Sequence, residues 1–302
     1  MQLPGFDELF AAADARNGRL TIAAAGAADP TVLEALACAH KRGWVQPILV
    51  GPIAAIESSA AAAKIDIAPF RVVDACEPAA TAVAEVRAGR AQILMKGQVD
   101  TPALMRAVLD PDWGLRTGRT ISQVVLMQID DQNRRFLLAD TGVTIEPTLA
   151  QKAEILESLI AVARCLGFAA PRVALLAATE KPTESMPDTL DSAELARRHR
   201  DGQFAGAIIQ GPLSFDLAYS GGAGVKKQIG GEVVGAADAL LFPNLVAANL
   251  TVKAMMYTAQ CRFGGILCGA ACPVVFMSRA DSVQTRLNSL AIALKAIVPA
   301  PS

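Results

Sequence analysis

One stretch, residues 92–110 (QILMKGQVDTPALMRAVLD), passes from a short apolar run through a glycine-containing turn into a segment with helical periodicity. The apolar run predicts a strand over 92–95, and the helical segment begins at Thr101, with Pro102 in its first turn, where proline is tolerated. The same order of strand, turn and helix recurs along the chain, which is typical of a mainly parallel sheet with crossover helices and predicts an α/β fold. The other predicted strands cover residues 20–24, 47–50, 122–129, 136–139, 172–177, 206–210, 239–242 and 273–277.

Length and charge limit the classes of protein. At 302 residues a single hydrophobic core stops growing, so we expect two domains. The 28 basic and 29 acidic side chains nearly cancel, which gives no reason to expect a nucleic-acid or membrane partner. The N-terminal sequence carries acids instead of a basic segment before an apolar one, so we predict no secretory signal and a cytoplasmic location.

The six cysteines lie in apolar segments, which is typical of reduced, buried thiols. Cys268 and Cys272 are spaced as some metal ligands are, but the only two histidines, His40 and His199, lie in basic, helix-like sequence. We therefore predict no metal site. The shortage of histidine also disfavours a Ser-His-Asp or HExxH hydrolase.

The clearest helix is predicted over residues 149–166, where leucine and alanine recur at helical spacing. Thr148 and Gln151 have the spacing of a capping box at its start. The preceding segment, residues 140–148 (DTGVTIEPT), is the best candidate for a crossing between domains.

Polar side chains cluster at three junctions where a predicted strand leads into a helix, and ligands of open parallel sheets bind at such places. At the first junction the strand ends at Met95 and Lys96 and Gly97 form a turn. Thr101 then opens the helix and Arg106 follows. Free backbone N–H groups at a helix start, with two cations beside them, form the kind of site that binds anions. The alternative is that both cations are solvated surface charges and that Thr101 only caps the helix.

At the second junction, residues 278–281 (SRAD) lie between an apolar strand and a helix. Arg279 can bind a phosphate through two hydrogen bonds, and the position favours that interpretation. Ser278 can donate to an oxyanion or a thiolate, and Asp281 can accept a proton. Asp281 has a glutamine three residues later, and this spacing slightly favours the alternative of a helix N-cap without a catalytic role.

The third junction contains a strand, a turn with Pro243 and a helix opened by Asn249, with Lys253 one turn later. Asn249 either caps this helix or reaches into a cleft. A glycine-rich stretch over residues 211–235 predicts a mobile loop. No GxGxxG follows a strand in the first half and no GxxxxGK[ST] occurs, so dinucleotide binding and P-loop chemistry lose support.

The chain resembles the phosphate acetyltransferase/phosphate butyryltransferase family, and most closely its butyryltransferase-type members. The resemblance extends over about residues 20–294, and the run SRADS followed by a helix is its most specific part. The motifs that carry it are, in order, ILMKGQVDTPALMRAVLD, GLRTGRTISQVVLM, LLADTGVTIEPT, GPLSFDLAYS, LLFPNLVAANLTVK and VVFMSRADSVQTRLNSLA.

The resemblance implies two α/β domains of the isocitrate/isopropylmalate dehydrogenase type. Residues 1–147 and 267–302 would form the first domain, and residues 148–266 the second, inserted one. It also implies a reversible reaction in a cleft between the domains, in which a short-chain acyl-CoA, from acetyl to butyryl, and orthophosphate give an acyl phosphate and CoA. No permanently bound cofactor is expected, because CoA is a substrate, and a homo-oligomer is expected.

By the same resemblance, Ser278 and Arg279 fall on the family's catalytic Ser-Arg pair, and Arg106 falls on an arginine that contacts the phosphoryl group. The other expected substrate-binding residues are Lys96, Thr101, Asn249 and Lys253. A thiol with a pKa of about 8.5 is only a few per cent thiolate at pH 7, so a base or a nearby arginine has to assist its ionisation. The thiolate would then attack the acyl carbonyl directly, with no covalent enzyme intermediate.

Three positions depart from the family pattern. Acetyltransferase-type members carry an acid seven positions after the serine, where this chain has Thr285, which leaves Asp281 as the candidate base. Many relatives have an acid and a glycine where this chain has Asn244 and Ala248. These departures leave open a catalytically weakened or non-catalytic homologue that binds CoA or acyl-CoA. A metal- and NAD-dependent decarboxylating dehydrogenase is the third hypothesis, but its aspartate cluster and nucleotide loop are not found.

Overall fold

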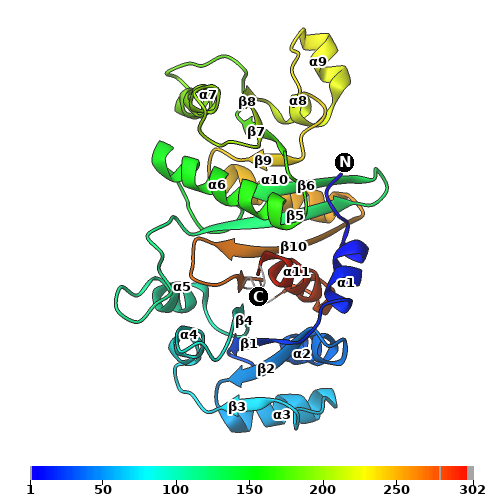
Figure 1. Cartoon of the computed structure of the whole chain (residues 1–302), viewed down its shortest axis with the longest axis vertical. Coiled ribbons are helices and arrows are strands. Elements are labelled where there is room, and N and C mark those ends of the chain that lie inside the picture. The colour runs from blue at the N-terminus through cyan, green and yellow to red at the C-terminus, as the bar shows by residue number, and fades with distance from the viewer. Residues whose placement is uncertain (1, 279, 298–302) are drawn as a thin grey trace. The chain divides into compact units, whose positions relative to one another are not determined.

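The computed structural model describes residues 2–278 and 280–297, and the chain packs into two compact units. Unit 1 consists of Met1–Gly5 and Thr120–Arg262, and unit 2 of Phe6–Arg119 and Phe263–Ser302. Both are mixed α/β structures with mainly parallel strands, which confirms the predicted fold class (Figure 1).

Unit 2 holds a parallel sheet in the order β3-β2-β1-β4-β11, with β10 antiparallel to β11. Its C-terminal helix packs against helices from the start of the chain, as the red and blue ribbons of Figure 1 show. The strands are β1 (Leu20–Ala25), β2 (Val45–Val50), β3 (Arg71–Val73), β4 (Ile93–Lys96), β10 (Cys261–Cys268, whose first two residues belong to unit 1) and β11 (Val274–Val275). The helices are α1 (Phe6–Asp14), α2 (Pro30–Lys41), α3 (Ile53–Ala63), α4 (Pro78–Arg87), α5 (Thr101–Leu109) and α11 (Val283–Ala296).

Unit 1 has the strand order β5-β6-β9-β7-β8, in which β5 and β6 are antiparallel and the others are parallel. Its strands are β5 (Ser122–Ile129), β6 (Arg134–Ala139), β7 (Arg172–Leu176), β8 (Ile208–Leu213) and β9 (Ala239–Leu241). Its helices are α6 (Leu149–Cys165), α7 (Pro187–Arg200), α8 (Phe215–Tyr219), α9 (Gly221–Lys227) and α10 (Leu245–Thr258).

The carboxyl ends of β1 and β4 are held together by a close backbone approach. The Gly97 N–H donates to the Ala25 carbonyl at 2.8 Å, and the Gln98 N–H donates to the Gly26 carbonyl at 2.7 Å. A Cβ atom on Gly97 would lie 2.3 Å from the Gly26 oxygen, so only glycine fits at this point. This glycine therefore brings the chain after Lys96 against the end of β1.

Most predicted strands are present within one or two residues of their predicted bounds, and the capping box of α6 at Thr148 is confirmed. The predicted loop over residues 211–235 is wrong in part, because it contains α8 and α9. All six cysteines are free thiols, but only Cys272 is buried, so the prediction of buried thiols is wrong for the others. The chain passes between the units after Gly5, after Arg119 and after Arg262. The predicted domain boundaries, at 147/148 and 266/267, stay a prediction.

Candidate active site

The strands β1, β4 and β11 are parallel neighbours in unit 2, so their carboxyl ends lie at one edge of the sheet. Ala25 pairs with Lys96, and Met95 pairs with Val275. The Lys96 side chain at the end of β4 is only 3% exposed, which excludes the interpretation of this residue as a solvated surface charge. Lys96 and the Ser278 turn thus follow two adjacent strands at the edge where open sheets bind their ligands.

The turn that begins at Ser278 folds back on itself through Asp281. The Ser278 N–H donates to Asp281 Oδ2 at 2.7 Å, and the Asp281 N–H donates to the Ser278 carbonyl at 3.2 Å. Helix α11 is capped one residue later, by Ser282, whose hydroxyl accepts the Thr285 N–H at 3.2 Å. The prediction of Asp281 as the N-cap is therefore wrong, because its carboxylate is already engaged by Ser278. Arg279 lies outside the described residues.

Burial raises the pKa of the Asp281 carboxyl above its ordinary value. The hydrogen bond from the Ser278 N–H and the charges of Arg286 and Lys96 act in the opposite direction, but they do not offset the loss of hydration. A carboxylate of this kind holds a proton more tightly than a surface aspartate does, which is the change that a general base for a thiol requires.

Arg286 is a buried residue near this turn that the sequence interpretation missed. Its side chain is 1% exposed, its Nη2 donates to the Ser278 carbonyl at 3.2 Å, and its Nε donates to Thr31 Oγ1 at 3.2 Å. One sequence signal could have identified Arg286. It lies on the same helix face as Leu290 and Leu294, where an apolar residue is expected and a charged one is unusual.

Arg106 and Thr101 lie on α5, next to a cavity of about 610 Å³. Arg106 is exposed, lines this cavity and forms no ion pair within the described ranges. Thr101 is the first helical residue and the cap position belongs to Asp100, so Thr101 is not the cap that the alternative interpretation expected. Neither Lys96 nor Ser278 lines this cavity. The structure therefore leaves Arg106 at the cavity, whereas Ser278 and Lys96 both act on Asp281.

Asn249 and Lys253 belong to α10 of unit 1. This helix begins at Leu245 and is capped by Asn244, whose side-chain oxygen accepts the Ala247 N–H at 3.0 Å. The prediction that Asn249 opens the helix is therefore wrong. Asn249 is half-buried in the second turn and Lys253 is exposed.

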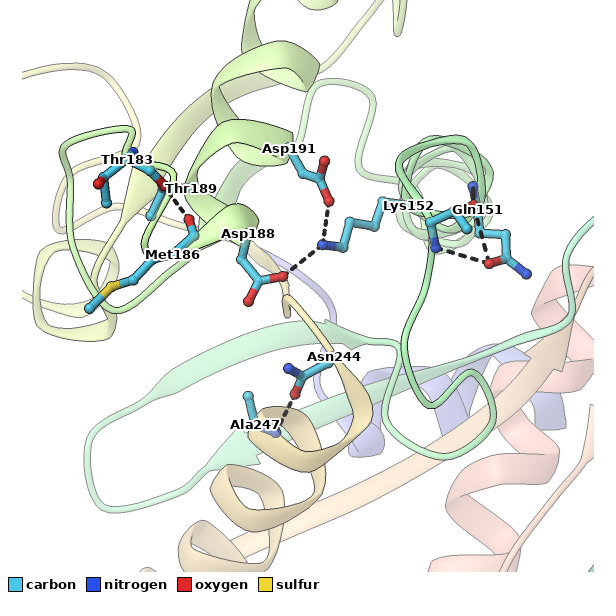
Figure 2. Close-up of polar contacts among 10 residues, drawn as sticks. Gln151, Lys152, Thr183, Met186, Asp188, Thr189, Asp191, Asn244 and Ala247 are labelled. Atoms are coloured by element: carbon cyan, nitrogen blue, oxygen red, sulfur yellow. Dashed lines mark hydrogen bonds and ion pairs between the residues drawn. The ribbon is translucent and has the colours of Figure 1, made fainter.

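A second cavity, of about 480 Å³, lies in unit 1 beyond the carboxyl ends of β7 and β9. Its lining is mainly apolar and includes Leu176, Met186, Phe215, Phe242 and Ala247. The start of α7 forms one wall, and this helix is tied to α6 through a buried lysine. Figure 2 shows Lys152 Nζ reaching from α6 to Asp188 Oδ1 at 2.9 Å and Asp191 Oδ2 at 2.7 Å on α7. The cavity thus has one firmly held wall.

Neither a metal centre nor a membrane span is found in the part of the chain that the structure describes. No group of three or more His, Cys, Asp or Glu side chains there is placed to hold a metal ion. No helix within the same residues has both the length and the apolar composition that crossing a bilayer requires.

Comparisons with known proteins agree with the family that the sequence motifs resemble. The model of the family described as phosphate acetyl/butaryl transferase matches residues 76–294. A phosphate butyryltransferase of Clostridium acetobutylicum is 39% identical over 277 residues, which cover 90% of this chain and 91% of that protein. A phosphate acetyltransferase of Rhizobium meliloti is 38% identical over 291 residues, or 95% of this chain and 92% of that protein. The chain belongs to the phosphate acetyl/butyryl transferase family.

Membership of the phosphate acetyl/butyryl transferase family makes the chain an acyltransferase, as the resemblance implied. The branched-chain phosphotransacylase from Enterococcus faecalis V583 matches with a TM-score of 0.81 at 30% identity, covering 92% of this chain and 98% of that one. A 4-hydroxythreonine-4-phosphate dehydrogenase from Klebsiella pneumoniae has a TM-score of 0.56 at 12% identity, covering 93% and 99%. The last likeness fits the expected dehydrogenase-type fold and shows the fold alone.

Two departures from the pattern of the phosphate acetyl/butyryl transferase family have a structural explanation. The Thr285 hydroxyl lies 3.1 Å from the Ser282 hydroxyl in the first turn of α11, so this position supports the helix start instead of supplying an acid. Asn244 caps α10, and asparagine and aspartate serve this purpose equally well. The exchange at residue 244 therefore preserves the local structure.

Proposed function

We propose that this acyltransferase interconverts short-chain acyl-CoA and orthophosphate with acyl phosphate and CoA, over the range from acetyl to butyryl. The observation that carries the proposal is the turn after β11, where Asp281 contacts the Ser278 backbone and the charges of two buried cations, Lys96 and Arg286, act on it. Family membership supplies the substrates, and this turn supplies the groups that such a reaction needs. CoA is a substrate, so no resident cofactor is part of the proposal.

In the direction of acyl-CoA formation, Asp281 accepts the proton of the CoA thiol. The thiolate attacks the carbonyl carbon of the acyl phosphate, the C–S bond forms, and the C–O bond to phosphate breaks with release of orthophosphate. Ser278 donates a hydrogen bond from its hydroxyl to the oxyanion of the tetrahedral intermediate, a contribution that is often the largest single one in acyl transfer. Arg279 and Arg106 hold the phosphate, a role assigned by resemblance.

Lys96, Thr101, Asn249 and Lys253 complete the proposed substrate-binding residues. Of these, Lys96 has the strongest support, because it is buried at the end of β4 and its charge acts on the Asp281 carboxylate. A cytoplasmic homo-oligomer with its active cleft between two domains remains part of the same proposal.

The test is an assay of purified protein with CoA and acetyl, propionyl or butyryl phosphate, in which the loss of free thiol is followed. We expect thiol loss that depends on the acyl phosphate, and Ser278→Ala should reduce it with the fold intact. No thiol loss with any of the three donors would reject the proposed reaction. Binding of CoA without turnover, measured by calorimetry, would instead favour the non-catalytic homologue, which the missing acid at Thr285 keeps as the second candidate.

A further inference from the structure

Arg286 is a fully buried cation at the start of α11, and its environment differs from that of the buried Lys152. Lys152 in unit 1 is held by two carboxylates. Arg286 has no carboxylate within ion-pair distance among residues 2–278 and 280–297. A buried charge without an ion-pair partner is costly, so its presence calls for a role other than helix packing.

The guanidinium of Arg286 joins two elements of unit 2. Its Nη2 donates to the Ser278 carbonyl and its Nε donates to Thr31 Oγ1, both at 3.2 Å. The Thr31 hydroxyl in turn donates to Asp29 Oδ1 at 2.6 Å, next to the start of α2. The Ser278 carbonyl is thus fixed to the start of α2 through one side chain.

The same Ser278 carbonyl also accepts the Asp281 N–H, so the contact from Arg286 acts on the hydrogen-bonded ring that closes this turn. Nη1 of Arg286 is buried and has no acceptor within the described ranges. The Asp29 and Asp281 carboxylates act on the guanidinium from beyond ion-pair distance, and the Arg286 charge acts together with Lys96 on the Asp281 carboxylate.

We propose that Arg286 is a positioning residue for acyl transfer: it fixes the Ser278 carbonyl and so sets the Ser278 hydroxyl and the Asp281 carboxylate in their reactive geometry. This inference rests on the proposed function. Because Arg286 is buried beneath the turn's backbone and is not itself placed on a substrate, its loss should affect turnover much more than substrate binding.

The experiment compares Arg286→Ala and Arg286→Lys with a matched control, Arg16→Ala. Arg16 also donates from Nη1 to a backbone carbonyl of α11, that of Leu294 at 3.3 Å, and also has a buried nitrogen without an acceptor. It contacts the opposite end of α11 from the Ser278 turn. The control therefore removes a similar anchor of the same helix without touching the proposed reaction site.

We expect Arg286→Ala to lower kcat by about 100-fold, the scale of a misplacement of about 1 Å, with KM for CoA and acyl phosphate nearly unchanged. Guanidinium ion, at concentrations too low to unfold the protein, should restore activity to Arg286→Ala saturably. It should not raise the activity of the wild type or of Arg16→Ala. Arg16→Ala should lower Tm and leave the kcat of the folded protein intact.

If Arg286→Ala does not fold, Arg286→Lys carries the test, because it keeps the charge and loses the two-pronged contact. A kcat that falls only with the folded fraction, or an equal loss in Arg16→Ala, would overturn the positioning role. Absence of turnover in the wild type with every acyl phosphate would reject the proposed function and this inference together. An active wild type with an unaffected Arg286→Lys variant would reject this inference alone.

Discussion

Replacing Asp281 by asparagine separates its contact with Ser278 from its capacity to take a proton. The amide oxygen of asparagine can still accept the Ser278 N–H, which the carboxylate accepts at 2.7 Å, but the amide cannot act as a base. The Ser282 cap of α11 is untouched by this change. A loss of activity in this variant therefore reports on proton transfer and not on the start of the helix.

The size of the loss follows from the thiol. With a pKa of about 8.5, CoA is about 3% thiolate at pH 7 and about half thiolate at pH 8.5, a ratio of about 15. A general base contributes about 10² to 10⁴-fold, so we expect kcat of Asp281→Asn to fall by about 100-fold at pH 7. The variant should then regain about 15-fold between pH 7 and pH 8.5, because the thiol ionises without help.

The assay measures kcat from thiol loss for both proteins across this pH range, at saturating CoA and acyl phosphate. A fall of less than about fivefold at pH 7, or the same relative loss at every pH, would refute the assignment of Asp281 as the base.

The stability of the Asp281→Asn variant gives an independent check. Because burial raises the pKa of Asp281 in the folded state, ionisation destabilises the fold as the pH rises through that value, so Asp281→Asn should have the higher Tm at pH 7 and no advantage below about pH 4.

Other changes test the rest of the molecule. Lys152→Met should destabilise unit 1 by about 2 kcal/mol in urea unfolding, less than a fully buried ion pair would cost, because the Asp188 and Asp191 side chains are 38% and 29% exposed. Burial lowers the pKa of Lys152, but both carboxylates outweigh this effect and raise the pKa. The difference in unfolding free energy between the wild type and Lys152→Met should therefore shrink above about pH 10.4. An unchanged difference at high pH would contradict the charge argument. Ala247→Phe, which fills the unit 1 cavity, should raise KM for CoA or acyl phosphate about tenfold, and unchanged KM values for both would place the cavity outside the substrate path. Arg106→Gln should raise KM for the phosphate-bearing substrate about tenfold with Tm unchanged, because the side chain is exposed; a lower Tm would indicate a structural role.

The parallel sheets could be predicted because β1, β2, β4 and β7 are short apolar runs between turn residues. Strand β10 (Cys261–Cys268) was missed because it contains two adjacent glycines, which argue against a strand. Their cause is tertiary: a Cβ atom on Gly264 would lie 2.8 Å from Asn288, and the Gly265 N–H donates to Ser289 Oγ at 3.0 Å. The close approach of α11 to β10 requires glycine at position 264, and no local pattern shows it.

Helix α9 shows the opposite error. Its sequence, GGAGVKK, has poor helix propensity and predicted a loop. Lys227 at its end contacts Glu180 at 2.9 Å and Asp216 at 3.1 Å, residues that are distant in sequence or lie on the previous helix. Tertiary contacts of this kind override propensity, and they are invisible until the chain is folded.

The site could be predicted where it depends on the ends of strands. It could not be predicted where it depends on which of two adjacent residues caps helix α11. Asp281 and Ser282 are both good N-caps, and sequence alone cannot choose between them. The choice decides the chemistry, because the cap at Ser282 frees Asp281 to turn back to Ser278.

The position of the α11 cap also bears on the acid that is replaced by Thr285 in this chain. Thr285 leaves the position used by acetyltransferase-type relatives without a carboxylate, and that loss alone would favour a non-catalytic homologue. In our proposal the turn compensates for this loss, because the Asp281 carboxylate accepts the Ser278 N–H and the charges of Arg286 and Lys96 act on it. An arginine that is buried behind that turn without a carboxylate at ion-pair distance costs more than an apolar residue of similar size would. This buried guanidinium is the observation behind our proposal that Asp281 replaces the missing acid in an active enzyme.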